Sequence, residues 1–222
     1  MNAKIFGVKI ERLLLCGEQT LYMIGWALLL GSIFGILLAV LLFLTRRGGL
    51  KQNVIIYSLL NGIINIVRSV PFVILLVAIM PFTRAIIGTT IGSRAALVPL
   101  IFYITPYMAR LVENSLLEVS GGIIEAAKAM GASTWQIVIH FLLPETLPSI
   151  ILALTTGTIG LLGASAMAGY VGGGGIGDLA LTYGYEKFNT PLMSFTVVIL
   201  IVIVQLIQGA GNAISRKIRE HK

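Results

Sequence analysis

Long apolar runs separated by short polar breaks dominate the chain, and five of them approach the roughly 20 residues that cross a lipid bilayer. The second run is interrupted by Arg68 and Pro71, and the third contains Pro99 and Pro106, so these two patterns are the least regular. The pattern predicts an all-α integral membrane protein. Its five predicted spans are residues 21–44, 54–80, 95–111, 150–171 and 192–208.

Composition agrees with this fold class. The 222 residues are 57% hydrophobic and only 11% charged, whereas soluble domains carry roughly 25% charged residues. The net charge of +7 would suggest nucleic acid for a soluble protein, but here the basic residues gather at the ends of apolar runs. The distribution of basic residues therefore indicates how the chain is oriented in the membrane, and we expect no nucleic-acid partner. The first run is too long for a signal peptide and is expected to remain as a span.

Lysine and arginine positions predict the orientation of the spans. Placing the C-terminus in the cytoplasm puts nine basic residues on the inner side and six on the outer side, with "RRGGLK" and "RKIREHK" both inside. This bias favours an external N-terminus and a cytoplasmic C-terminus. The polar segment 118–148 is then a cytoplasmic loop.

That loop contains "EAAKAMGASTWQIVIHFLLPETLP", an island of small and charged residues. Helix formers predict a short helix over 125–130 that ends at Gly131. Ser133 and Gln136 have capping-box spacing, so a second helix is expected to begin there and to run until Pro144. Ala126 and Ala127 would give the first helix a smooth docking face, Gly131 would allow a tight turn and close backbone approach, and Glu125 would face a cap or a basic partner. An ordinary interfacial linker is the alternative.

The spacing of Glu125, Ala126, Ala127, Gly131, Leu143 and Pro144 resembles the EAA signature of the permeases of ABC importers. Phe141 stands where that family usually has isoleucine. The resemblance implies that this segment is a coupling helix, which inserts into a cleft of a cytoplasmic ATPase subunit. The chain has no G-x-x-x-x-G-K-[ST] loop, so we expect ATP to be bound by a partner and no cofactor by this chain.

Further segments are similar to the methionine-importer permeases, a branch of that family. They include "NIVRSVPFVILLVAIMPF", "ARLVENSLLEV" and "SAMAGYVGGGGIGDLALTYGY". The resemblance implies a type I importer transmembrane domain over about 16–211 in the bacterial cytoplasmic membrane. It also implies a homodimer on two ATPase subunits, supplied with L- or D-methionine by an external substrate-binding lipoprotein. A stand-alone secondary transporter or channel is the alternative, and clustered catalytic side chains for a membrane enzyme are absent.

Arg68 lies inside an apolar run, where a charge is costly. Asn61 and Asn65 share its helix face, so the three could line a polar pathway. The alternative is a structural network in which Arg68 pairs with Glu113 or Glu118. Glu113 and Asn114 are otherwise interpreted as interfacial anchors.

Two features are expected at the outer side. "SAMAG" places Ser165 among small residues, and Met167 could act as an apolar plug, although packing is the ordinary role of a methionine. Gly172 to Gly177 matches G-x-G-x-x-G without the βαβ context of a nucleotide site. We therefore expect either a loop over the pathway or a plain flexible turn. His140 is interpreted as a surface residue and Cys16 has no assigned role.

Overall fold

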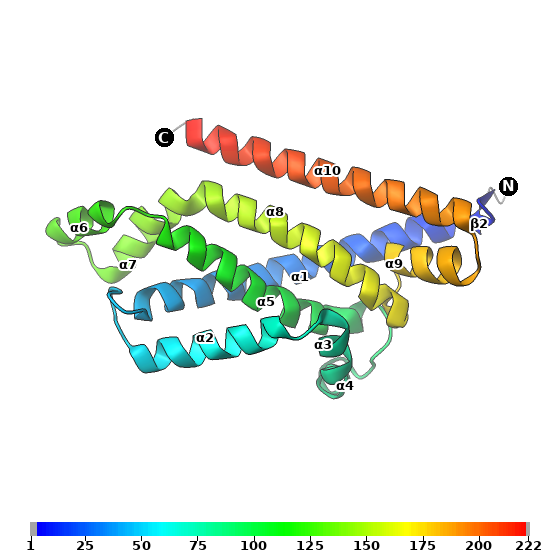
Figure 1. The fold of residues 1–222 in the computed structure, drawn as a ribbon, viewed down its shortest axis with the longest axis horizontal. Helices are drawn as coiled ribbons and strands as arrows, with labels where there is room; N and C mark the ends of the chain where they lie inside the picture. Colours follow the sequence, from blue (N-terminus) through cyan, green and yellow to red (C-terminus); the bar gives the residue numbers. More distant parts are fainter. Residues whose placement is uncertain (1–3, 221–222) are drawn as a thin grey trace.

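The computed structural model describes residues 4–220, and it is helical apart from one short hairpin (Figure 1). The first half contains β1 (Lys4–Ile5), β2 (Val8–Lys9), α1 (Ile10–Thr45), α2 (Val54–Ser69), α3 (Phe72–Ala78), α4 (Met80–Ile87) and α5 (Ser93–Leu117). The second half contains α6 (Gly121–Ala129), α7 (Thr134–Gln136), η1 (Ile137–Leu142), α8 (Leu143–Ala168), η2 (Gly169–Gly173), α9 (Ile176–Asp178), η3 (Leu179–Glu186) and α10 (Thr190–Glu220). The elements labelled η have π-helical hydrogen bonding.

Four helical stretches within residues 4–220 are long and apolar enough to cross a membrane: α1, α5, the continuous stretch Thr134–Gly173 and α10. A fifth crossing would need α2 and α3 together, and these two helices meet at an angle of 105°. The bend falls at Val70 and Pro71, because proline removes a backbone donor and disfavours helix in the residue before it. The observed helices extend beyond the predicted spans at both ends of α1, α5 and α10.

The most extensive helix contact in the described chain joins α1 to α5. Gly31 and Gly35 lie four residues apart on α1, and a Cβ at Gly35 would fall 2.6 Å from the Cβ of Met108 on α5. This spacing is the small-xxx-small arrangement that lets membrane helices approach closely. Pro99 and Pro106 lie inside α5 without ending it, because both are buried against neighbouring helices.

The long helices lie side by side along the longest dimension of the molecule (Figure 1). The C-terminal end of α10 lies at the same end as α6 and α7, whereas the N-terminal hairpin, α4 and α9 lie at the opposite end. We call these the coupling end and the hairpin end. The EAA segment is therefore separated from the glycine-rich segment by the whole length of the bundle.

Candidate functional site

The short helix α6 carries Glu125, Ala126 and Ala127 at the coupling end. Glu125 and Ala126 are exposed, but Ala127 is 0% exposed. Ala127 belongs to the main hydrophobic cluster with Ile137 and Val138 of η1, against which α6 packs. The prediction that both alanines form a smooth external face is therefore wrong for Ala127. Its small side chain seats α6 on the protein's own core.

Gly131 ends α6 through a change in backbone direction. Its φ is +76°, a left-handed conformation that favours glycine. The N–H of Gly131 donates to the carbonyl of Lys128 and the N–H of Ala132 donates to the carbonyl of Ala127, at 2.9 and 3.1 Å. These two bonds form a Schellman motif. A Cβ on Gly131 would meet nothing within 4 Å, so the turn, and not a close approach within this chain, requires the glycine.

The second helix begins as predicted. The backbone N–H of Ser133 donates to Oε1 of Gln136 at 2.8 Å, and the Gln136 N–H donates to the Ser133 Oγ at 3.4 Å, which completes the capping box.

The predicted end at Pro144 is wrong, because the helix continues from Thr134 through Leu143 and Pro144 to Gly173. The turns immediately before Pro144 are π-helical, and this wider winding accommodates a ring that would clash with an α-helical carbonyl. Leu143 is half-buried beside the main cluster, and Pro144 is exposed.

Two large apolar side chains beside α6 were not singled out in the sequence. Met130 is 69% exposed and Trp135 is 63% exposed, on either side of the Gly131 turn. Exposed tryptophan is enriched where protein surfaces bind partners. Their position beside the EAA residues is the signal that could have identified them. Glu125, Ala126, Met130 and Trp135 together form an exposed surface at the coupling end, which we call the α6 surface.

A polar cluster joins α2 to α5 within the bundle. Arg110 donates to Oε2 of Glu113 at 2.6 Å, to Oδ1 of Asn61 at 2.6 Å and to Oδ1 of Asn65 at 3.0 Å. Glu113 is only 2% exposed, so it is a buried partner and not the interfacial anchor expected from the sequence. Arg68, by contrast, is exposed and forms an ion pair with neither Glu113 nor Glu118. Asn61 and Asn65 thus bind the same side chain, Arg110, and the predicted ion pair of Arg68 with Glu113 or Glu118 is wrong.

Replacing Arg110 with glutamine is expected to destabilise the protein by about 2 kcal/mol. The change removes the charge that compensates Glu113, and uncompensated buried charges are strongly unfavourable. Arg68→Gln is the matched control and is expected to leave stability unchanged, since Arg68 is exposed. Thermal unfolding of the two purified variants measures the difference. Equal unfolding temperatures for both would contradict the assignment of the cluster to Arg110.

The two gate candidates on α8 differ in their surroundings. Ser165 is buried, and its hydroxyl donates to the carbonyl of Leu162 at 2.8 Å within its own helix. Met167 is 48% exposed. Gly163, one turn earlier, is also exposed, and a Cβ there would meet nothing within 4 Å. Met167 is thus available to a surface outside this chain, whereas Ser165 packs within it.

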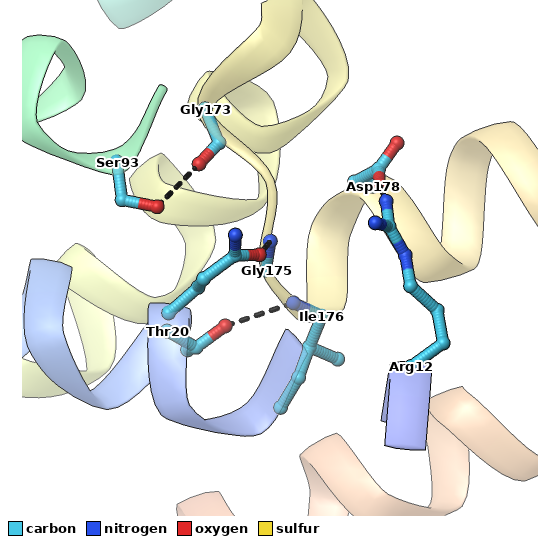
Figure 2. A network of polar contacts seen from close by, with 8 residues as sticks. Arg12, Thr20, Ser93, Gly173, Gly175, Ile176 and Asp178 are labelled. Carbon is cyan, nitrogen blue, oxygen red and sulfur yellow. Dashed lines mark hydrogen bonds and ion pairs between the residues drawn. The ribbon is translucent and has the colours of Figure 1, made fainter. Parts of the chain in front are cut away.

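The glycine-rich segment after α8 is firmly held at the hairpin end (Figure 2). The Ser93 hydroxyl donates to the Gly173 carbonyl, and the Gly175 N–H donates to Oε1 of Gln19, each at 2.8 Å. The Ile176 N–H donates to Oγ1 of Thr20, also at 2.8 Å. The plain flexible turn considered from the sequence is therefore wrong.

Glycine is required here by both conformation and space. Gly172, Gly174 and Gly175 have φ values of +100°, +75° and +89°. A Cβ at Gly175 would lie 2.7 Å from Oγ1 of Thr20. A Cβ at Gly177 would overlap the Cα and carbonyl oxygen of Ala166. The segment closes the end of α8 onto α1.

Within residues 4–220, no group of three or more histidine, cysteine, aspartate or glutamate side chains is arranged to hold a metal ion. His140 is exposed and Cys16 is buried.

Comparison with known proteins places this geometry among transport proteins. The family described as "Binding-protein-dependent transport system inner membrane component" matches residues 22–220. The probable D-methionine transport system permease protein MetI of Vibrio cholerae is 46% identical over 97% of this chain and 96% of its own. The methionine import system permease protein MetP of Bacillus subtilis is 43% identical over 79% of each chain. A solved structure, described as an inward-facing conformation of the MetNI methionine ABC transporter, superposes with a TM-score of 0.92. It is 45% identical and covers 94% of this chain and 97% of its own.

Proposed function

The chain belongs to the family of binding-protein-dependent transport system inner membrane components, and from this premise we propose that it is the membrane-spanning permease subunit of an ATP-driven methionine importer. It is a transport subunit and not an enzyme. The similarity to methionine permeases extends over nearly the whole chain, and this observation supports methionine as the transported substrate. L- and D-methionine are both proposed as cargo.

The structure of α6 supports the coupling role. The Ala127 contact and the Schellman turn at Gly131 set the angle at which α6 projects from the bundle. The α6 surface then offers Glu125, Ala126, Met130 and Trp135 to a cytoplasmic ATPase subunit. Because α6 packs on η1, which is continuous with α8, a displacement of α6 is transmitted along one helix toward Met167 at the other end.

We propose that two copies of the chain enclose the translocation pathway and that two ATPase subunits bind to them. The exposed α8 face around Gly163 and Met167 would meet the second copy, and Met167 would act there as an apolar plug. Ser165 is assigned a packing role beside it. ATP binds to the partner, and this chain takes no cofactor of its own. An external substrate-binding lipoprotein would deliver methionine at the hairpin end.

The chain is a multi-pass protein of the inner membrane family. For its orientation we propose an external N-terminus and a cytoplasmic C-terminus. The basic residues Arg216, Lys217 and Arg219 lie on α10 at the coupling end, which fits the preference of cytoplasmic segments for lysine and arginine.

Methionine uptake by the reconstituted chain is expected to require ATP and the ATPase partner. Proteoliposomes that contain the full complex, with the binding protein added, should accumulate labelled methionine only with ATP. Proteoliposomes that contain this chain alone should show none, because the chain has no nucleotide-binding loop. Uptake driven by a proton or sodium gradient without the ATPase would instead establish the stand-alone transporter. An ATP-dependent complex that rejects methionine but accepts another solute would overturn only the substrate.

A further inference from the structure

A basic cleft opens at the hairpin end, between the start of α1 and the start of α10. It has a volume of about 460 Å³, and its charged lining residues are Lys9, Arg12 and Lys187. Tyr183 and Asn189 complete the polar part of its wall. We call this feature the hairpin cleft. None of its residues takes part in the α6 surface or in the Arg110 cluster.

The cations of the hairpin cleft are only partly compensated by the protein. Arg12 forms an ion pair of 2.8 Å with Asp178, but its Nε is buried and has no hydrogen-bond partner among the described residues. The Nζ of Lys187 lies 4.0 Å from the centre of the Tyr183 ring. Lys9 is exposed on the hairpin and forms no ion pair in the described chain. Excess positive charge remains in the cleft, and it favours an anionic ligand.

These cations are concentrated on the side of the membrane where basic residues are uncommon. With the proposed orientation the hairpin end is external, where lysine and arginine are disfavoured. Three of the six basic residues assigned to that side nevertheless line this one cleft. A bound anion would neutralise part of the positive charge of these three residues.

The surface next to the cleft is apolar and suits lipid. Asn189 lies immediately before α10, and its side-chain amide donates to the Phe6 carbonyl at 2.7 Å, which joins the hairpin to that helix. About two turns further along, α10 exposes Val197, Val198 and Ile201. In the most apolar stretch of α10, only 11% of the residues are buried. A ligand that combines an anionic head with hydrocarbon chains matches both surfaces.

We propose that the hairpin cleft binds the phosphate of an anionic phospholipid, with the acyl chains lying along the exposed face of α10. Lys9 and Lys187 donate to the phosphate oxygens, and the guanidinium of Arg12, whose side chain is 38% exposed, adds its positive charge at the cleft wall. The Arg12–Asp178 ion pair holds that guanidinium at the cleft wall. This inference does not depend on the identity of the transported solute, and the proposed orientation enters only in assigning the lipid to the outer leaflet.

The test uses the chain purified together with its ATPase subunits. Native mass spectrometry counts the lipids retained from mixtures of phosphatidylglycerol and phosphatidylcholine, and titration with phosphatidylglycerol gives the affinity. We expect preferential retention of phosphatidylglycerol. The double variant Lys9→Gln/Lys187→Gln should bind it more weakly, by roughly fivefold for each lysine removed. Arg84→Gln/Arg94→Gln is the matched control, because it removes two exposed charges assigned to the same side and outside the cleft.

Three outcomes would overturn the proposal. Equal affinity of the two double variants for phosphatidylglycerol would show that the cleft is not the site. Binding of inorganic phosphate as tightly as phosphatidylglycerol would show a simple anion site that does not use the acyl chains. If Lys9→Gln/Lys187→Gln loses binding-protein docking in phosphatidylcholine nanodiscs while its phosphatidylglycerol affinity is unchanged, the cleft binds an acidic protein surface. Single Lys9→Gln, on an exposed residue, provides the same comparison if the double variant does not assemble.

Discussion

Replacing Ala127 with leucine is expected to abolish ATP-driven methionine uptake while the protein still inserts into the membrane. Ala127 is fully buried where α6 packs on η1, so the larger side chain must push α6 away from the bundle. Overpacking of this kind typically costs about 1–3 kcal/mol. That energy can be relieved by tilting a nine-residue surface helix, which leaves the spans intact but misaligns the α6 surface.

The measurement is uptake by reconstituted complexes, with ATP hydrolysis recorded in parallel. Ala127→Ser is the control, because it keeps the small volume and should retain most of the uptake. If the leucine variant transports methionine as well as the serine variant does, the seating of α6 has no part in coupling. Loss of uptake in the serine variant as well would point to the alanine methyl group and not to the available space.

Replacing Gly177 with valine is expected to destabilise the protein by more than about 3 kcal/mol, above the usual cost of overpacking. The added Cβ would overlap backbone atoms of Ala166 on α8. A flexible side chain can move aside, but this backbone is held inside a long helix. Helix α9 would therefore move away from α8, and the hydrogen bonds from the glycine-rich segment to Gln19 and Thr20 would be strained.

Thermal unfolding and the yield of folded complex measure this effect. Gly25→Ala on α1 is the matched control, since Gly25 is exposed and a Cβ there meets nothing within 4 Å, and it should preserve the unfolding temperature. An unchanged unfolding temperature for Gly177→Val would mean that α8 and α9 are not packed as closely as described. The control variant also separates general effects of losing a glycine from the effect of this contact.

Local patterns in the chain predicted several features correctly. The spacing of Ser133 and Gln136 predicted a capping box, because both hydrogen bonds of that motif connect residues three apart. The EAA spacing and the absence of a nucleotide loop together indicated a permease subunit that depends on an ATPase. Hydropathy predicted an all-α membrane fold because a bilayer accepts helices whose backbone groups are paired within each segment.

Other features depend on residues far apart in the chain. The partner of Asn61, Asn65 and Glu113 is Arg110 and not Arg68, because the packing of α2 against α5 decides which arginine faces them. Pro144 continues a helix because the preceding turns widen. The glycine-rich segment is hydrogen-bonded to Ser93, Gln19 and Thr20, which come from other helices.

The sequence by itself determined the membrane fold class, the capping box, the turn at Gly131 and the resemblance that leads to the permease family. All of these follow from hydropathy, from hydrogen bonds within one turn of helix, or from a linear motif. Only the tertiary structure decided that Ala127 faces inward, that Arg110 completes the polar cluster and that three cations form the hairpin cleft. Linear spacing specifies which side chains share a helix face, but packing decides what that face meets.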